Sequence, residues 1–315
     1  MILVAGSANL DFVVRAPHIP GPGETVLGSD FRMFAGGKGA NQAIACARAG
    51  AVDTSLLIAL GHDSFAEPIK ASLNATGVKL HIVRSDNLPT GTAFICVSDS
   101  AENAITVAPG ANTALRAEHL PDLTGTNYLL LQLETPLDTV TAYAEAARKA
   151  GVAVVLNAAP AQALPPKLLA LVDVLVVNEG ELASISNCTG NVADCLKQLP
   201  DVPCIVVTLG ARGCCARVGG QIMLQSAFAI TPVDTTAAGD TFCGVLVACL
   251  AQQHALPAAL SRASAAGALA CMRAGAQESI PTSAEIDQFL LRQLKDAPAN
   301  AAADAALAVF AGFNF

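Results

Sequence analysis

The stretch DTTAAGDTFCG, residues 234–244, places small residues and then an acid at the start of an apolar segment. Ala237, Ala238 and Gly239 leave backbone N–H groups uncovered where a helix is predicted to begin, and a helix N-terminus favours negative charge. A phosphate group fits such a place, and Asp240 beside it is suited to accept a proton from a hydroxyl that attacks the phosphate. The alternative is that Asp240 is an N-cap that bonds the first turn of the helix.

The glycine-rich stretch GGKGAN, residues 36–41, precedes a segment with a helical pattern. Its glycines allow the backbone to approach a ligand closely, and Lys38 and Asn41 are polar side chains in the same loop. The spacing differs from that of a Walker A loop, so the stretch is not predicted to be a P-loop. It is either part of a small-ligand site or an ordinary turn before a helix.

The stretch SANLD, residues 7–11, is predicted to end the first strand. Side chains alternate along a strand, so Ser7, Asn9 and Asp11 are expected to share one face. An amide and a carboxylate together offer the donors and acceptors that adjacent sugar hydroxyls require. The alternative is a capped strand end without a ligand.

Two acidic stretches follow later strands. Glu134 ends the run LLLQLE, and a carboxylate beside a buried strand needs a partner, for which a ligand hydroxyl and the ammonium of Lys38 are both candidates. Asn178 and Glu181, in NEGE, are three residues apart at a predicted helix start and so lie on one face. They are suited to ordering the water around a magnesium ion, or they form an N-cap with an acidic first turn.

Apolar runs of strand length separate these stretches and alternate with Ala-rich helical patterns. Runs without polar alternation predict strands that are buried on both faces, and hence a parallel sheet covered by helices. The predicted fold class is therefore α/β, with a doubly wound, mainly parallel sheet flanked by helices and with ligands at the carboxyl ends of the strands. The runs are residues 2–14, 52–60, 128–134, 152–160, 172–179 and 203–210. The last of them leads into TLGARG, residues 208–213, which either holds part of a nucleotide or is a plain turn.

Two segments interrupt this rhythm. Residues 12–35 carry Pro and Gly around short strands, and residues 89–108 predict a hairpin made of TAFICVS and NAITVA. We expect the two segments to form a small β-sheet outside the main domain, as a lid. The chain is therefore divided into a domain of residues 1–296 and an Ala-rich tail, residues 297–315, to which no function is assigned.

The composition restricts the kinds of partner. The chain has 315 residues, a net charge of −8 and no basic block, which argues against nucleic acid. No apolar run approaches the roughly 20 residues that span a bilayer, and the start lacks the basic region of a signal peptide. The 10 cysteines show no CxxC pair and the 5 histidines are scattered. We therefore expect reduced thiols in the cytoplasm, no membrane partner and no metal site built from His and Cys.

The order and spacing of SANLD, GGKGAN, NEGE, TLGARG and DTTAAGDTF resemble those of the ribokinase branch of the PfkB family of carbohydrate kinases. The resemblance covers residues 1 to about 295, with signature regions at 36–50 and 234–247. GGKGAN with NLD upstream points to the ribose branch rather than to adenosine kinases. The resemblance implies ATP-dependent phosphorylation of ribose at O5, with Mg²⁺, an activating K⁺, and a homodimer formed through the lid.

The resemblance also implies a role for each matching position. Asp240 is the implied catalytic base, and the backbone of Ala237, Ala238 and Gly239 is the implied anion hole. The implied sugar-binding residues are Asn9, Asp11, Gly37, Lys38, Asn41, Glu134 and Asp240. The implied ATP-binding residues are Asn178, Thr208, Gly210, Arg212, Gly213, Gly239 and Ser264. Glu181 is the implied magnesium-associated acid, acting through water. The implied potassium-site residues, most of them acting through backbone carbonyls, are Asp234, Thr236, Ala270, Arg273, Gly275 and Ser279.

Three positions depart from the family pattern. Ser264 stands where His or Asn is frequent near adenine, Cys243 where Asn is frequent one turn after the base, and Ala66 where Gly is often found. The alternative functions are a kinase for deoxyribose, a nucleoside such as pseudouridine or a hexose acid, and a non-catalytic sugar-binding sensor. Asp240 beside a complete anion hole argues against the sensor. The absence of GxGxxG after the first strand argues against a dinucleotide oxidoreductase.

Overall fold

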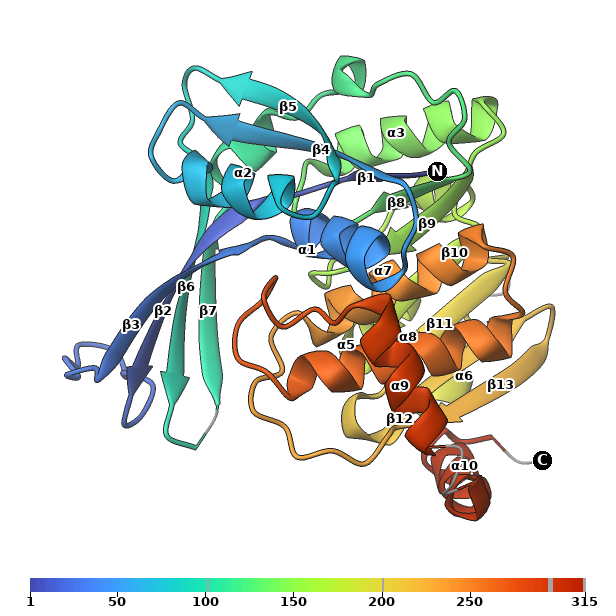
Figure 1. Ribbon diagram of the computed structural model, residues 1–315. Helices are drawn as coiled ribbons and strands as arrows, with labels where there is room; N and C mark the ends of the chain where they lie inside the picture. Colours follow the sequence, from blue (N-terminus) through green and yellow to red (C-terminus); the bar gives the residue numbers. More distant parts are fainter. Residues whose placement is uncertain (101, 200, 294–296, 314–315) are drawn as a thin grey trace.

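The computed structural model describes residues 1–100, 102–199, 201–293 and 297–313. The described chain forms a nine-stranded sheet and a separate four-stranded sheet (Figure 1). The predicted domain of residues 1–296 and the predicted tail of residues 297–315 each include positions outside this description, so their bounds remain predictions.

The large sheet is mainly parallel, as predicted. Its strand order is β13-β12-β11-β10-β9-β8-β1-β4-β5, and the pairs β11–β12 and β12–β13 at one edge are antiparallel. The strands are β1 (Ile2–Ala5), β4 (Thr54–Gly61), β5 (Lys79–Ser85), β8 (Tyr128–Leu131), β9 (Ala153–Asn157), β10 (Val174–Asn178), β11 (Cys204–Thr208), β12 (Gly213–Val218) and β13 (Gln221–Ser226).

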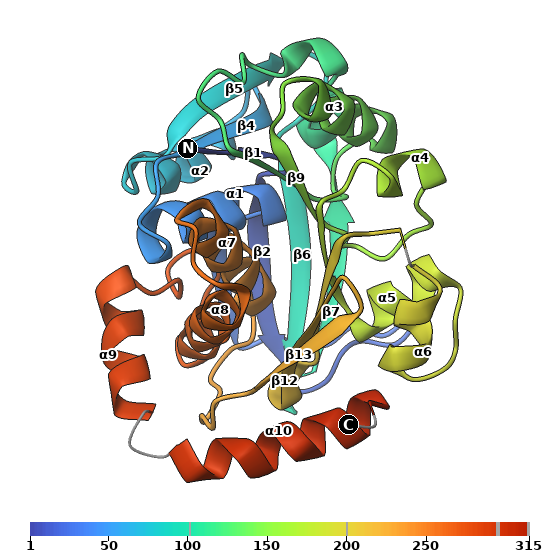
Figure 2. The same ribbon diagram turned by 90° about the vertical axis from the view of Figure 1, so that its right-hand side faces the viewer.

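Helices cover both faces of the large sheet because its inner strands are apolar on both sides (Figure 2). In β1, for example, Ile2 and Val4 belong to the core on one face, and Leu3 and Ala5 belong to the core on the other. The first face is covered by α1 (Lys38–Ile44), α2 (Ala66–Asn74), α7 (Ala238–Ala251), α8 (Leu256–Cys271) and α9 (Ser283–Gln293). The second face is covered by α3 (Leu137–Lys149), α4 (Pro166–Leu169), α5 (Glu179–Ser186), α6 (Val192–Lys197) and α10 (Ala297–Ala311). None of the described helices has the length and apolar character needed to cross a membrane.

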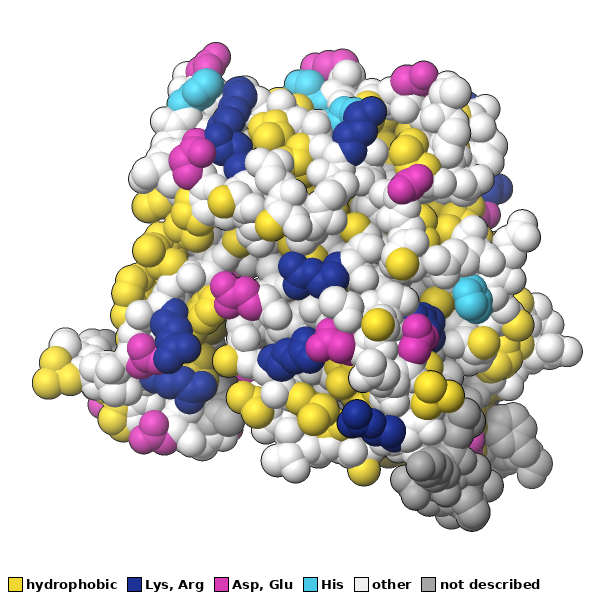
Figure 3. All heavy atoms as spheres, in the orientation of Figure 1, with side chains coloured by type: hydrophobic (Ala, Val, Ile, Leu, Met, Phe, Trp, Pro, Cys, Tyr) yellow, Lys and Arg dark blue, Asp and Glu magenta, His cyan; other side chains and the backbone are white. Residues whose placement is uncertain are grey.

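The small sheet is the predicted lid. Its strands are in the order β3-β2-β6-β7, and they are β2 (Asn9–Ala16), β3 (Asp30–Gly36), β6 (Gly91–Ser98) and β7 (Asn103–Ala108). It projects from the large sheet at the left of Figure 1, and apolar side chains gather along this edge in Figure 3. The large apolar side chains on the lid strands that are more than half exposed are Phe31, Met33, Phe94 and Ile105.

The opening run, residues 2–14, is not one strand, so this part of the prediction is wrong. β1 ends at Ala5 in the large sheet, and β2 begins at Asn9 in the lid. SANLD therefore joins the two sheets, with Asn9 and Asp11 on one face of β2 and Ser7 in the connection. The chain crosses close to its neighbours at Gly6, where an added Cβ would lie 1.9 Å from Gln132 Oε1.

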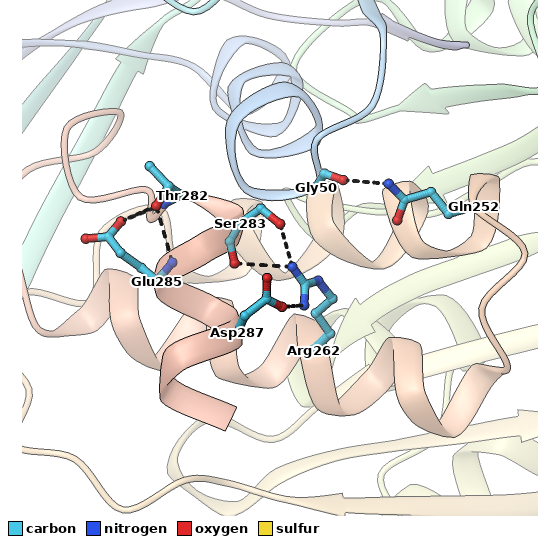
Figure 4. Close-up of polar contacts among 7 residues, drawn as sticks. All are labelled: Gly50, Gln252, Arg262, Thr282, Ser283, Glu285 and Asp287. Atoms are coloured by element: carbon cyan, nitrogen blue, oxygen red, sulfur yellow. Dashed lines mark hydrogen bonds and ion pairs between the residues drawn. The ribbon is translucent and has the colours of Figure 1, made fainter. Parts of the chain in front are cut away.

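The connection between α8 and α9 is fixed at its far end by side chains (Figure 4). Arg262 on α8 donates to Asp287 and, at 2.7 Å, to the hydroxyl of Ser283 on α9. Glu285 accepts from the backbone N–H of Thr282 at 2.7 Å, which caps the start of α9. The same connection contacts the segment before α7, where the backbone N–H of Gly275 donates to Asp234 at 2.9 Å.

Candidate active site

A cavity of about 230 Å³ lies where the carboxyl ends of β9, β10 and β11 meet the start of α7. This is the place at which an open α/β sheet binds ligands. Seven of the predicted site residues line it, namely Lys38, Asn178, Glu181, Thr208, Ala237, Gly239 and Asp240. The cavity therefore brings together stretches that are up to about 200 residues apart in the chain.

The start of α7 is open toward the cavity. Ala237 is the N-cap, in a left-handed conformation with φ 58°, and makes no side-chain hydrogen bond to the first turn. A Cβ added to Gly239 would meet no atom within 4 Å, so the space in front of this backbone is free for a ligand. Asp240 is the third residue of the helix, and the alternative that it is an N-cap is wrong. The geometry suits an anion at a helix N-terminus.

The carboxylate of Asp240 is buried and is held by two side-chain amides. Asn41 Nδ2 donates to Oδ2 at 2.9 Å, and Gln42 Nε2 donates to Oδ1 at 2.9 Å. Gln42 is itself held, because its Nε2 also donates to Asn157 Oδ1 at 2.9 Å and its Oε1 accepts from Gln132 Nε2 at 2.7 Å. The acid is therefore fixed in position before any substrate arrives.

Gln42 and Gln132 were not among the residues singled out from the sequence. Gln42 is fully buried on α1, within the run ANQAIACARA, where a long polar side chain stands among small apolar ones. That contrast is the signal that marks it, because a buried amide requires partners. Its partners on α7 and on β9 lie more than 100 residues away in the chain.

Glu134 anchors the glycine turn that precedes α1. Its Oε2 accepts from the hydroxyl of Ser7 at 2.5 Å and from the backbone N–H of Lys38 at 3.2 Å. Glu134 was expected to pair with a ligand hydroxyl or with the ammonium of Lys38. It instead accepts from the hydroxyl of Ser7 and from the backbone N–H of Lys38. Gly37 has φ 89°, and a Cβ there would lie 2.7 Å from the Cα of Ala8, so the turn requires glycine.

Acidic groups surround Lys38. Burial by itself would lower the pKa of its ammonium, but the charges of Asp240, Glu134 and Glu181 outweigh burial and raise this pKa. The ammonium therefore stays positive beside the open start of α7. A fixed cation there favours a phosphate group.

The lid residues Asn9 and Asp11 are not among the residues that line the cavity, but Asp11 lies near enough to Glu134 and Asp240 to feel their charges. Burial, and then repulsion by Glu134 and Asp240, raise the pKa of Asp11 to about 7. Asn9 Oδ1 accepts from Asn112 Nδ2 at 2.7 Å, and Asn112 Oδ1 accepts in turn from the backbone N–H of Ala8. Both lid residues are buried, and the amide of Asn9 is held by Asn112.

The predicted nucleotide residue Asn178 and the predicted magnesium-associated acid Glu181 bond each other rather than distant parts of the chain. Asn178 and Glu181 form a capping box, in which each side chain accepts from the other's backbone N–H at 2.8 Å. Burial raises the pKa of Glu181. Gly210 and Gly213 have φ 57° and 116°, which only glycine adopts readily, so they shape the turn after β11.

The remaining predicted positions lie around the cavity or away from it. Arg212 pairs with Glu179 at 2.6 Å and is not among the cavity-lining residues. Ser264 lies on α8 near Cys214 and is not a lining residue either. Cys243 does line the cavity, and burial raises the pKa of its thiol well above the usual value, so it is neutral. Ala66 is fully buried at the start of α2.

The two segments of the predicted potassium site meet beside the start of α7. Asp234 accepts from the backbone N–H of Thr236 through Oδ1 and from that of Gly275 through Oδ2, both at 2.9 Å. Arg273 points its guanidinium at Glu285, and the carbonyl of Ala270 accepts from the backbone N–H of Arg273. The sixth predicted residue, Ser279, is buried and donates to the carbonyl of Ala276. Within the described ranges, no group of three or more His, Cys, Asp or Glu residues is placed to hold a metal ion.

Comparison with known proteins identifies the family. The sequence model of the pfkB family carbohydrate kinases matches residues 1–283. The chain belongs to the PfkB family of carbohydrate kinases. It is similar to the ribokinase of Haemophilus influenzae, with 37% identity over 92% of this chain and 98% of that protein.

Solved structures of family members agree with the fold. The ribokinase of Thermotoga maritima matches with a TM-score of 0.82 and 32% identity, covering 92% of this chain and 98% of that one. The Arabidopsis thaliana ribokinase, solved in complex with ribose and ATP, matches with a TM-score of 0.82 and 31% identity over the same shares. The predicted ribokinase-like α/β fold with a lid sheet is thus confirmed.

Proposed function

We propose that the protein is a ribokinase, which transfers the γ-phosphoryl group of ATP to O5 of D-ribose. The observation that carries this proposal is the carboxylate of Asp240, held by two amides beside an open helix start in the cavity. The ribokinases of Haemophilus influenzae and Arabidopsis thaliana, similar over most of the chain, support it.

In the proposed reaction, Asp240 accepts the proton of the ribose O5 hydroxyl as O5 attacks the γ-phosphorus. The bond from the γ-phosphorus to the oxygen that bridges it to the β-phosphate breaks, and ADP leaves. The backbone N–H groups at Ala237, Ala238 and Gly239 face the negative charge that develops on the transferred group. Lys38, which remains an ammonium, adds positive charge there. Donors fixed in advance of this kind usually supply a large share of the acceleration, because they need no reorganisation during the reaction.

We assign sugar binding to Asn9, Asp11, Gly37, Lys38, Asn41 and Glu134. Among the described residues, Asn41 Oδ1 is buried without a hydrogen-bond partner, which is the state expected of an acceptor that a sugar hydroxyl would satisfy. Asp11 and Asn9 lie on the same face of β2 and offer a carboxylate and an amide to vicinal hydroxyls.

We assign the nucleotide and the ions to the part of the site formed by the ends of β10 and β11 and the starts of α5 and α7. We assign ATP contacts to Asn178, Thr208, Gly210, Arg212, Gly213, Gly239 and Ser264, of which Asn178, Thr208 and Gly239 line the cavity. Glu181, also a lining residue, is the proposed acid that orders water around Mg²⁺, which would neutralise phosphate charge. The proposed K⁺ site uses backbone carbonyls of the 234–236 and 270–279 segments.

Assembly and location are part of the same proposal. The exposed apolar side chains of the lid support a homodimer formed through that sheet. All ten cysteines are free thiols, which supports the reducing conditions of the cytoplasm. We keep the division into a kinase domain of residues 1–296, with lid segments 12–35 and 89–108, and a tail of residues 297–315.

A substrate panel tests the proposed function. The purified protein is given Mg²⁺, K⁺ and ATP with ribose, 2-deoxyribose, pseudouridine and a hexose acid, and ADP formation is followed by a coupled assay. We expect ribose to have the highest kcat/KM and the product to carry phosphate on O5. A 31%-identical deoxyribokinase of Salmonella typhi makes 2-deoxyribose the second candidate. A better nucleoside or deoxyribose substrate would overturn the ribose assignment.

A further inference from the structure

The C-terminal helix α10 packs against the part of the molecule that carries the predicted nucleotide site. The family model matches only residues 1–283, so α10 lies beyond that match. Figure 2 shows it running along the lower edge of the molecule. Leu307 and Ala311 are 3% and 0% exposed and join the core on the α3–α6 face. The helix is therefore docked on the domain through an apolar contact.

Helix α10 is followed directly by Gly312, which lies close to the start of α6. Gly312 has φ 82°, and a Cβ there would lie 2.4 Å from the Asn191 side chain, which caps the start of α6. A left-handed glycine after the last turn is a common helix terminator. The end of α10, just after Phe310, therefore lies directly against the start of α6.

One side chain of α10, Phe310, contacts the turn made by residues 208–213, and a second, Asp304, contacts the end of β13 beside it. Asp304 accepts from the backbone N–H of Ser226 at 3.0 Å and from its hydroxyl. The next residue, Ala227, donates from its backbone N–H to the carbonyl of Arg212 at 3.2 Å. The ring of Phe310 lies under the guanidinium of Arg212, with 3.7 Å between the guanidinium carbon and the ring centroid.

The other side of the same guanidinium is held by α5. Arg212 donates to Glu179 Oε2 at 2.6 Å, and Glu179 is the first residue of α5. Glu179 directly follows Asn178, whose side chain caps α5 and lines the cavity. Arg212 therefore links the wall of the cavity to α10, and its charge is committed to protein groups on both sides.

We propose that α10 is a positioning element of the ATP site, in which Phe310 and Asp304 hold the 208–213 turn in the conformation that receives the nucleotide. The proposal rests on the proposed kinase function. Phe310 is a positioning residue, because it acts through Arg212 rather than by touching ATP. Its ring and Glu179 enclose the guanidinium, so removal of the ring frees Arg212 and the turn that carries Gly210 and Gly213.

The test measures the binding of ATP and of ribose separately in variants of the full chain. Phe310→Leu keeps an apolar side chain for packing but removes the cation–π contact, which at a half-exposed position corresponds to about a two- to five-fold change in affinity. We expect the Kd and KM for ATP to rise by about that factor, with the KM for ribose unchanged. Phe310→Tyr retains the ring and is expected to behave like the unmodified protein.

Matched variants separate positioning from stability. Val309→Ala alters the neighbouring side chain, which is 79% exposed, and is expected to change neither constant. Asp304→Asn weakens the second contact and is expected to raise the KM for ATP in the same direction. An unchanged Kd for ATP in Phe310→Leu, or equal rises in the KM values for ATP and ribose, would overturn the proposal.

Calorimetry of ATP binding without sugar distinguishes this proposal from the function on which it rests. If the unmodified protein binds ATP but does not phosphorylate ribose, the ribose assignment fails and the comparison of Phe310 variants still decides the role of α10. If the unmodified protein does not bind ATP, both proposals fail.

Discussion

The proposed sugar side and the proposed nucleotide side of the site are built on different principles. On the proposed sugar side, buried polar side chains bond one another across distant parts of the chain, as Ser7 does with Glu134 and Gln42 with Asp240. On the proposed nucleotide side, Asn178 and Glu181 bond within their own helix start. The sugar side is thus a network of buried side chains. The nucleotide side is a set of turns and helix ends, which the partly exposed contacts of Arg212 tie to α5 and α10.

This difference has consequences for specificity. Buried donors and acceptors that lose a partner are costly, so a network of them discriminates sharply between hydroxyl patterns. Backbone turns such as the one at Gly210 and Gly213 present N–H and C=O groups whatever the side chains are. Substitutions on the sugar side should therefore change turnover and substrate choice strongly, and those on the nucleotide side should have smaller, graded effects.

The largest expected effect is that of Asp240→Asn. The amide keeps the shape but cannot act as the base, so kcat is expected to fall by about 10²–10⁴ while ribose still binds. Steady-state turnover and ribose calorimetry measure the two properties. Asp138→Asn changes an exposed acid in the first turn of another helix, α3, and serves as the control. Near-normal turnover in Asp240→Asn would remove Asp240 from its role.

The next largest effect is expected for Gln42→Met. This change removes an amide that donates to the Asp240 carboxylate, and hydrogen bonds to charged groups are worth about 1.5–3 kcal/mol. We expect kcat to fall by about 10- to 100-fold with a much smaller change in the KM for ATP. Gln252→Met, on the exposed end of α7, loses only a bond to the carbonyl of Gly50 (Figure 4) and is the control. Equal activity of the two variants would show that Gln42 does not position the base.

Replacing ribose with 2-deoxyribose tests whether the proposed sugar-binding residues hold the hydroxyl that 2-deoxyribose lacks. An acceptor left without its hydroxyl costs about 1–3 kcal/mol, so kcat/KM is expected to be correspondingly lower for 2-deoxyribose. In Asp11→Asn the difference between the two sugars should shrink, because the carboxylate that distinguishes them is gone. A preference that persists unchanged in this variant would mean that Asp11 does not hold the missing hydroxyl.

The sequence predicts much of the fold because apolar runs and their polar ends are local features. The runs that became β4, β8, β9, β10 and β11 could be located directly, and the small residues before Asp240 marked the open start of α7. The crossing from one sheet to the other at Gly6 could not be predicted in this way. The alternation of side chains continues across it, and nothing local distinguishes a bent strand from two strands.

The partners of buried polar groups were also beyond prediction. That Gln42 bonds Asn157 and Asp240 depends on how three elements pack, and these residues are more than 100 positions from Gln42. Similarly, an Ala-rich composition is compatible with a helix at the C-terminus, but it does not say that Phe310 meets Arg212. Such contacts are set by tertiary packing, which the pattern of a single segment does not contain.

The pH dependence of stability tests the electrostatics of the lid residue Asp11. Its pKa is about 7 in the folded protein, against 3.8 as the ordinary value. Between these values the folded state binds more protons, so the stability contributed by this group is present at low pH and is lost as the pH rises through about 7.

Between about pH 5.5 and 7.5, we therefore expect the free energy of unfolding of the unmodified protein to fall by about 2 kcal/mol more than that of Asp11→Asn. Denaturant titrations at several pH values measure this difference. Asp99→Asn, in an exposed turn of the lid, is expected to leave the pH dependence as it is in the unmodified protein. Parallel curves for Asp11→Asn and the unmodified protein would contradict the high pKa.

The smallest and most condition-dependent effect is expected from the monovalent cation. Ala237 is held in a left-handed conformation directly after Thr236, and Asp234 ties this segment to Gly275. Such a conformation in a residue other than glycine costs free energy and persists only when its surroundings fix it. Backbone carbonyls that meet around a large, weakly hydrated cation would supply that restraint, and would so hold the N–H groups that face the phosphate. The arginine of this segment, Arg273, is already paired with Glu285, which leaves the carbonyls as the groups to bind a cation.

We therefore expect turnover with Mg²⁺ and ATP to rise several-fold when K⁺ replaces Na⁺ at constant ionic strength, with a bulky organic cation behaving like Na⁺. Identical rates in all three salts would mean that residues 270–279 are only a turn that ends a helix, and that protein contacts alone keep the start of α7 open.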